Sequence, residues 1–310
     1  MSTTRRDVAQ SPWSIAWRRL RRRPGALWGA GIAGALLLAG VAAPLLARLE
    51  GQDPYTYHID LLDPARGNIP HGPFGGVSRA HWFGVEPLTG RDLFAITVYG
   101  ARTSLLIGLS ATVLAVSVGT IVGLTSAYLG GWTDMVLSRV TDVMFGFPTL
   151  IFMIALGAIV PPDFPRPVLL VLIIGLFGWP YFARLVRGFG LSLVQRDFVE
   201  AARMLGARPW RVIGHELLPN VTGPIIALGT LTIPGNIATE AALSFLGVGV
   251  SPPTPDWGRS INDSADWIQS DAMYLIFPAG MLLLTVLALT VLGDGLRDAL
   301  DTRTVRLTSR

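Results

Sequence analysis

Long stretches without charged residues alternate with short charged segments along the chain. The windows that contain no Asp, Glu, Arg or Lys are 26–47, 103–133, 143–162, 167–183, 221–239 and 272–293. Each can hold the roughly 17–25 apolar residues that a helix needs to cross about 30 Å of hydrocarbon. Because lipid offers the backbone no hydrogen-bonding partner, each window is predicted to be helical. We therefore predict an all-α polytopic membrane protein with six spans, the third starting near Leu137 and the fifth reaching Gly247.

The arginines fix the predicted orientation of these spans. With the N-terminus in the cytoplasm, 18 of the 25 arginines fall on the cytoplasmic side and 7 on the other side. The positive-inside rule then places both termini in the cytoplasm. The predicted segments are an N-tail 1–25, a first span 26–47, an extracytoplasmic loop 48–102, a core 103–294 with a cytoplasmic loop 184–220, an outer loop 251–271 and a last span 272–293, and a C-tail 294–310.

The N-tail has the pattern of a helix that lies in the membrane interface. Trp13, Trp17 and Leu20 share one helical face, and the arginines at 18–19 and 21–23 would meet anionic lipid headgroups. The apolar window at 26–47 is longer than the apolar core of a secretory signal peptide. We therefore expect the first span to be an uncleaved anchor in contact with membrane lipid.

Composition removes most catalytic chemistry from consideration. The chain is 51% hydrophobic and only 15% charged, whereas soluble domains are about 25% charged. Because it contains neither Lys nor Cys, it has no phosphate-loop lysine, lysine Schiff base, thiol nucleophile or cysteine–zinc site. The loop histidines His58, His71 and His81 lack metal-ligand spacing. We expect no metal site and no bound cofactor.

Small residues and prolines predict how the spans pack. The second span carries small residues at strict four-residue spacing, which allows two helices to approach closely. They are Ala111, Ala115, Gly119, Gly123 and Ala127. The partner helix could belong to this chain or to another. Prolines interrupt three later spans and are expected to kink them. They are Pro148, Pro180, Pro224 and Pro234.

Charged residues within the spans are few. Arg139 and Asp142 are one helical turn apart and are expected to pair. Glu240 lies in the outer part of the fifth span, where it must face protein or water because exposure to lipid is costly. A structural partner and a pathway-lining role both stay open for Glu240. Trp257 and Trp267 in the outer loop fit an aromatic belt at the membrane surface.

The segment 195–220 predicts two short helices outside the membrane. Asp197 and Glu200 have the spacing of a capping box, Gly206 is a natural helix stop, and Pro209 suits the start of a second helix. The apolar faces of the two helices would be Phe198, Ala202 and Leu205, and Trp210, Ile213 and Leu217. Such stripes could dock into a groove on a partner protein or lie on the bilayer.

These residues carry a family resemblance. Glu200, Ala201, Ala202, Gly206, Leu218 and Pro219 match the EAA motif of ABC importer permeases in identity and spacing. Further segments resemble the C-type permease of dipeptide and oligopeptide importers: TGRD at 89–92, YGARTSL at 99–105, EAALSFLG at 240–247, PPTPDWG at 252–258 and GDGLRDALD at 293–301. The chain departs from the pattern at Glu216, at Val85-Glu86 and at Thr302.

The resemblance implies a type I ABC importer permease in the bacterial inner membrane, which is not itself an enzyme. Its expected partners are a homologous B-type permease, two cytoplasmic ATPase subunits that use ATP and magnesium, and an extracytoplasmic substrate-binding protein. No nucleic acid is expected. The EAA residues would couple the chain to an ATPase, while Glu240, Arg139 and Asp142 are candidates for the pathway or an interface.

The cargo implied by the resemblance is a dipeptide or oligopeptide. Importers of nickel, glutathione or opines in the same family are alternatives. An autonomous secondary transporter and an integral membrane enzyme are the competing classes, although the sequence carries neither clear inverted repeats nor a convincing cluster of catalytic residues.

Overall fold

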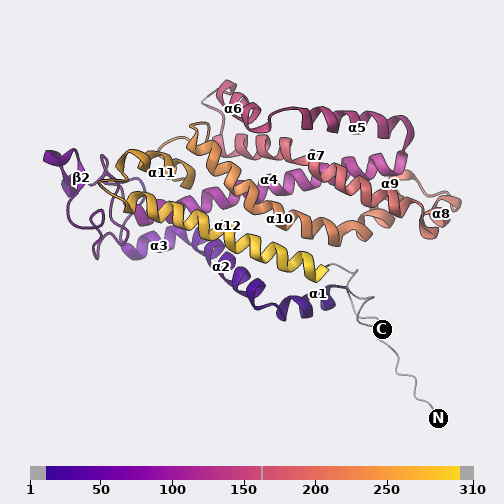
Figure 1. Cartoon of the computed structure of the whole chain (residues 1–310), viewed down its shortest axis with the longest axis horizontal. Helices are drawn as coiled ribbons and strands as arrows, with labels where there is room; N and C mark the ends of the chain where they lie inside the picture. The colour runs from indigo at the N-terminus through magenta and orange to yellow at the C-terminus, as the bar shows by residue number, and fades with distance from the viewer. Residues whose placement is uncertain (1–11, 162, 301–310) are drawn as a thin grey trace, which may run out of the picture.

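The computed structural model describes residues 12–161 and 163–300, which form an elongated bundle of helices (Figure 1). Within these residues, five helices are long and apolar enough to cross a membrane. They are α2 (Pro24–Val41), α4 (Leu93–Leu129), α7 (Arg166–Val194), α10 (Leu218–Phe245) and α12 (Met273–Leu300). The strands of the described residues, β1 (Leu62–Asp63) and β2 (Ile69–Pro70), are two residues long and antiparallel. The prediction of an all-α membrane protein is confirmed.

The sixth apolar segment is a bent pair of helices and not one continuous span. Helix α5 (Gly131–Gly146) and helix α6 (Thr149–Ile159) meet at an angle of 85°. The break falls at Phe147 and Pro148, which both have extended backbone. Proline disfavours a helical conformation in the residue before it and cannot donate a backbone hydrogen bond. The predicted breaker at Pro148 therefore ends one helix and begins another.

Several boundaries differ from those of the charge-free windows, and two of them have a clear physical cause. The first apolar window divides at Ala42 into α2 and α3 (Ala43–Glu50), because Pro44 sits in the first turn of α3 and cannot continue the hydrogen-bonding of α2. Helix α4 starts at Leu93 and not at residue 103, since Asp92 Oδ1 accepts a bond from Ala95 N and caps the helix there. Arg102 is thus inside a helix that begins beyond the apolar window.

The predicted seam of small residues is where α4 meets α7. All five small side chains are buried, and backbone approach is closest at two glycines. A Cβ on Gly119 would lie 2.4 Å from Phe182 Cβ, and one on Gly123 would lie 2.6 Å from the Ala183 carbonyl oxygen. From the other side, a Cβ on Gly190 would lie 2.6 Å from Ala127 Cβ. The partner helix left open by the sequence therefore belongs to this chain.

The bundle has two distinct ends. At the α8 end lie α8 (Asp197–Met204) and α9 (Pro209–Arg211), and α1 (Pro12–Arg21) and the last turn of α12 lie toward that end (Figure 1). At the α11 end lie α3, the two strands and α11 (Trp257–Ser264) (Figure 1). This arrangement puts both ends of the described chain on the side of the predicted cytoplasmic loop.

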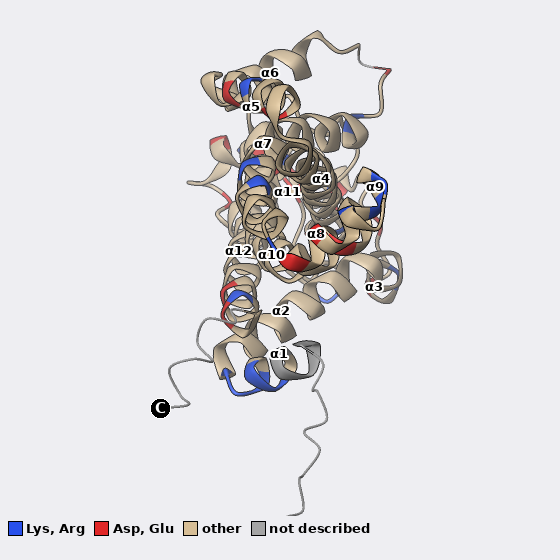
Figure 2. Cartoon of the chain, turned by 90° about the vertical axis from the view of Figure 1, so that its right-hand side faces the viewer, with Lys and Arg blue, Asp and Glu red and all other residues tan. Residues whose placement is uncertain are grey.

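Helix α1 packs on the bundle through one residue of its predicted apolar face. Leu20 is buried against Ala26 and Ala299, while Trp17 is 52% exposed with the Arg21 guanidinium over its ring. Basic residues gather along α1 (Figure 2). The Trp13 side chain, residues 1–11 and the predicted C-tail beyond residue 300, with Thr302, lie outside the described residues.

The seam predicts opposite effects for two glycine-to-alanine changes. Gly119→Ala should lower the free energy of unfolding by about 1–3 kcal/mol, because its methyl group would overlap Phe182. Gly188→Ala, in α7 with nothing within 4 Å, should raise it by about 0.5–1 kcal/mol. Thermal unfolding of the purified variants measures both. Equal effects at the two positions would contradict a tight seam.

Candidate functional site

The predicted loop 184–220 forms a compact unit at the α8 end. Val199 is buried, and it packs in one cluster with Val186 of α7 and Leu217. Arg203 Nε donates to Tyr128 Oη at 3.4 Å, and the guanidinium lies 4.7 Å from the centre of that ring. Helix α8 is therefore attached to the ends of both α4 and α7.

The turn after α8 depends on one glycine. Gly206 has a φ of +74°, in the left-handed region that side chains disfavour, and no atom lies within 4 Å of where its Cβ would be. The requirement for glycine is therefore conformational and not steric within this chain. The predicted helix stop at Gly206 is confirmed.

The capping box predicted for α8 is not formed. Helix α8 begins at Asp197 itself, Arg196 occupies the N-cap, and no side chain caps it. Asp197 and Glu200 both lie in the first turn of α8. Negative charge there is stabilised by the helix dipole, so the two acids favour the helix without closing the hydrogen-bonded box.

The second short helix is not separate from the span that follows. Pro209 starts α9 as predicted, but the chain then passes through a π-helical turn, Val212–Leu217, directly into α10. Leu218 and Pro219 are the first residues of α10. Pro219 cannot bond to the carbonyl four residues earlier, and the wider π turn accommodates that loss without ending the helix. A push on α9 therefore acts directly on a membrane span.

The outer face of this unit is apolar and exposed. Met204 and Leu205 are 79% and 89% exposed, and Trp210 is 66% exposed across the Gly206 turn. Glu200 and Ala201 are also exposed, whereas Ala202 is half-buried. Figure 2, which views this end of the molecule, places the acids of α8 beside the basic residues of α9. The predicted stripes thus divide: Ile213 and Leu217 face the bundle, while Leu205 and Trp210 face outward. The buried apolar residue of α8 is Val199 and not the predicted Phe198.

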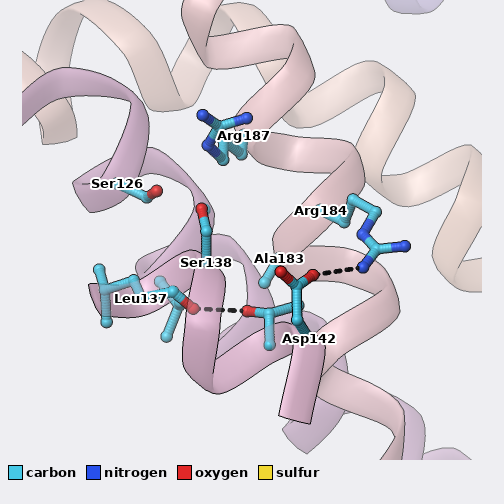
Figure 3. A pocket seen from close by; sticks show the side chains of 10 residues that line it. Ser126, Leu137, Ser138, Asp142, Ala183, Arg184 and Arg187 are labelled. Carbon is cyan, nitrogen blue, oxygen red and sulfur yellow. Dashed lines mark hydrogen bonds and ion pairs between the residues drawn. The ribbon is translucent and has the colours of Figure 1, made fainter. Parts of the chain in front are cut away.

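A polar pocket of about 360 Å³ lies between α4, α5 and α7 (Figure 3). Asp142 Oδ1 accepts a bond from Arg184 Nη2 at 2.9 Å, and Arg139 Nη1 lies 3.9 Å from Asp142 Oδ2. The expected Arg139–Asp142 pair is present, but Arg184 on the neighbouring helix is the nearer partner. Both Asp142 ion pairs are exposed.

Sequence reasoning missed the stronger ion pair of this pocket. Arg187 Nε and Nη2 donate to the two oxygens of Asp134 at 2.5 and 2.6 Å. Ser126 Oγ also donates to Asp134. The bidentate bond ties the start of α5 to α7 and to the end of α4. One pattern in the sequence could have indicated this pair. Asp134 lies near the start of one apolar segment, and Arg184 and Arg187 lie three residues apart on another.

The candidate residue Glu240 is fully buried. Its side chain is 0% exposed, between α4, α10 and the residues before α11. Ser244 Oγ donates to Glu240 Oε1 at 3.0 Å. The contacts of Glu240 in the structure are with protein, which is one of the two roles left open by the sequence.

At the α11 end, a buried polar cluster joins α3 to α4. Glu50 Oε1 accepts a bond from Trp82 N at 2.6 Å, and His81 Nδ1 lies 2.8 Å from Asp92 Oδ2. The His58 and His81 rings meet edge to face at 5.1 Å. His81 is therefore a buried partner of Asp92, not the solvated loop residue that was expected. The described residues contain no group of three His, Asp or Glu side chains placed to hold a metal ion.

Burial sets the protonation of this cluster. It raises the pKa of Glu50 to about 7 and the pKa of Asp92 to about 6. Burial also lowers the pKa of the His81 imidazole. If protonated, the otherwise unpartnered Glu50 Oε2 can donate to Asp92, and a neutral His81 can donate through Nδ1 to the same carboxylate. Both contacts hold the N-terminus of α4 against α3.

The TGRD segment at 89–92 has a physical explanation here. Gly90 has a φ of +69°, and a Cβ there would lie 2.2 Å from the His58 carbonyl oxygen. Arg91 Nε donates to Glu86 Oε1 at 2.5 Å, so Glu86, one of the departures from the family pattern, holds the turn in place. Trp257 is fully buried, with Nε1 donating to the Thr97 carbonyl at 2.9 Å. The expected interfacial position of Trp257 was therefore wrong.

Comparison with known families supports the resemblance. Residues 87–306 match the model of the binding-protein-dependent transport system inner membrane component. Residues 11–70 match the N-terminal TM domain of oligopeptide transport permease C. The chain belongs to the inner-membrane permeases of binding-protein-dependent transport systems. The permease is a multi-pass protein of the bacterial inner membrane.

Individual relatives agree with this assignment. The permease is 38% identical to the dipeptide transport system permease protein DppC of Alkalihalophilus pseudofirmus, covering 95% of this chain and 91% of the relative. It is 36% identical to the glutathione transport system permease protein GsiD of Escherichia coli, covering 97% of this chain and 94% of the relative. Its fold is similar to a chain of the inward-facing MetNI methionine ABC transporter, with a TM-score of 0.53, 17% identity and coverage of 67% of this chain and 98% of that one.

The two ion pairs of the pocket should differ in strength. Asp134→Ala should lower the free energy of unfolding by about 1.5–3 kcal/mol, since it leaves Arg187 without its bidentate partner. Asp142→Ala, on the same helix, should lower the free energy of unfolding by only about 0–1 kcal/mol, because the ion pairs of Asp142 are exposed. Double-mutant cycles with Arg187→Ala and Arg184→Ala, measured by thermal unfolding, give the two coupling energies. A larger coupling for the Asp142 pair would contradict this assignment.

The Glu50 cluster predicts a pH dependence. The folded state raises the pKa of Glu50 from 4.5 to about 7 and that of Asp92 from 3.8 to about 6. The stability that these two groups contribute is therefore fully present below their ordinary pKa values. It is lost as the pH rises through the pKa values of the folded state. His81 acts in the opposite direction, since its lowered pKa makes protonation costly as pH falls. Hydrogen exchange of residues 81–92, measured relative to the intrinsic base-catalysed rate at each pH, should therefore accelerate between about pH 6 and pH 8. Glu50→Gln should remove that acceleration, and an unchanged pH profile would refute it.

Proposed function

We propose that this permease forms half of the translocation pathway of an ATP-driven importer for short peptides. The observation that carries the proposal is the unit at the α8 end, in which exposed apolar side chains flank a conformationally required glycine. Met204, Leu205 and Trp210 have no cover within the described residues. Apolar helix faces of this kind dock into grooves on partner proteins.

The partner proposed for this face is a cytoplasmic ATPase subunit. The α8 end then lies in the cytoplasm, which agrees with the arginine distribution. A second permease completes the pathway, and an extracytoplasmic binding protein delivers the cargo to the α11 end. ATP and magnesium are used by the ATPases, in keeping with a chain that has no lysine for a phosphate loop.

The contacts of α8 suggest how movement reaches the spans. Val199 and Arg203 attach α8 to α7 and α4, and α9 continues through the π turn into α10. When the ATPases close, displacement of this unit would tilt three spans together. ATP can drive that change only if it binds one packing of the helices more tightly than the other.

The cargo is proposed from the chemistry that the relatives' names share. A dipeptide and glutathione both contain at least one peptide bond, an amino group and at least one carboxylate. The pocket between α4, α5 and α7 offers both charge signs, from Asp142 and Arg184, which suits a zwitterion. An autonomous transporter would place coupling-ion acids in a water-filled site, whereas Glu240 is fully buried.

Substitution of Gly206 tests the coupling role. Gly206→Val should lower peptide uptake by about tenfold or more while the ATPases continue to turn over, because a left-handed residue other than glycine costs about 1–2 kcal/mol and displaces α8. Gly214→Val is the matched control, since Gly214 lies in the helical π turn with nothing within 4 Å. Uptake and ATP hydrolysis would be measured in vesicles that hold the permease with its partner subunits.

Co-purification separates this proposal from its alternatives. The tagged permease should retain an ATPase subunit, and Leu205→Glu should release it while the helical content of the permease is unchanged. Normal uptake by the Gly206→Val variant, or a wild-type permease that transports peptide without any ATPase, would contradict the proposed function.

A further inference from the structure

Two buried carboxyl groups meet where α11 joins the bundle. Glu240 is 0% exposed and Asp256 is 1% exposed. Each has one oxygen in a hydrogen bond: Ser244 Oγ donates to Glu240 Oε1 at 3.0 Å, and Arg259 N donates to Asp256 Oδ1 at 2.9 Å. The second oxygens, Glu240 Oε2 and Asp256 Oδ2, are buried and have no donor within the described part of the chain.

The backbone forces these two groups together. A Cβ on Gly258 would lie 2.2 Å from the Ala241 carbonyl oxygen, so the first turn of α11 is pressed against α10 beside Glu240. Asp256 is two residues before Gly258 and Glu240 is next to Ala241, so this backbone contact brings together the two segments that carry the carboxyl groups, and the charge of Asp256 acts on Glu240. Trp257, between Asp256 and Gly258, is fully buried and bonded to Thr97 of α4.

Nothing nearby among the described residues neutralises two negative charges. The α10 neighbour of Glu240 is the Ser244 hydroxyl, and α4 contributes the buried Ser104 hydroxyl. On α11, the Arg259 side chain is directed to Asp263, with Nε 3.2 Å from Oδ2. Asp256 is therefore the charged group that acts on Glu240. Two ionised carboxylates buried side by side would repel strongly.

We propose that Glu240 and Asp256 share a single proton and that this bond positions α11 on α10. One proton gives each unpaired oxygen a partner: the protonated carboxyl donates and the other carboxylate accepts. The pair then carries one negative charge instead of two, and that charge lies at the N-terminus of α11, where Asp256 is the cap. Glu240 is thus a positioning residue that acts through Asp256.

The position of α11 bears on transport because α11 forms a wall of a polar pocket of about 340 Å³ at this end. Arg259, Asn262 and Asp263 of α11 line it together with Arg166 and Ser244. The consequence for transport rests on the proposed function, whereas the shared proton does not.

Two substitutions at Glu240 test the pairing within the intact transporter. Glu240→Gln keeps a donor for Asp256 and the same net charge, so peptide uptake should stay within about twofold of wild type. Glu240→Leu has a similar size but no donor, which leaves the Asp256 oxygen buried and unpaired. Uptake should then fall by about tenfold or more, and adding Asp256→Asn should recover most of it because no carboxylate remains.

The docking of α11 can be followed independently of transport. The chain contains no cysteine, so Ser260→Cys introduces a single thiol at a buried position of α11. Its maleimide labelling rate should rise about tenfold or more with Glu240→Leu and stay unchanged with Glu240→Gln. An infrared difference spectrum of wild type minus Glu240→Gln should contain the carbonyl band of a protonated carboxyl group.

Each contrary result overturns the proposal. If Glu240→Gln is as damaging as Glu240→Leu, or Glu240→Leu is as harmless as Glu240→Gln, then a hydrogen-bond donor at residue 240 is not required. A difference spectrum without the protonated carboxyl band excludes the shared proton. If wild type takes up no peptide at all, the proposed function fails, but the labelling and infrared results still decide this inference.

Discussion

The close approach of α4 and α7 is the constraint on which the rest of the permease depends. Lipid gives two apolar helices no hydrophobic reason to associate, so contact must come from backbones that pack without intervening side chains. Gly119 and Gly123 allow this, since a methyl group at either would overlap α7. The seam fixes the ends of both helices, and those ends hold α8 at one side and Asp92 with its partners at the other.

Polar contacts then complete what the apolar seam begins. The bidentate Asp134–Arg187 pair fastens α5, which otherwise packs loosely, to the α4–α7 pair. At the α11 end, buried acids do similar work where helices begin: Asp92 caps α4, and Asp256 caps α11. A buried carboxylate needs hydrogen-bond donors. Here some of those donors come from other segments of the chain, so an acid that caps its own helix also attaches that helix to its neighbours.

Charge-free windows predicted where the apolar helices lie because hydrocarbon penalises charge and unpaired backbone so strongly. They located boundaries poorly. Asp92 and Arg102 showed that a helix can extend beyond its apolar window, and Pro44 and Pro148 divided windows that composition alone left whole. Gly206 was predictable because its left-handed backbone admits few other residues. The Asp134–Arg187 pair was not, since its members are far apart in sequence and only the α4–α7 seam brings them together.

The continuity of α9 with α10 links the two ends of the permease. The sequence suggested a separate short helix. Such a helix could rock on its turn without moving a span. The π turn at Val212–Leu217 instead joins the segment after Gly206 to the helix that carries Glu240. Bending is expected only at the π turn and at Pro224 and Pro234, so displacement of α9 is passed toward α11 through a helix that can flex at those points. The hydrogen bond at Glu240 then determines whether α11 follows α10 or separates from it.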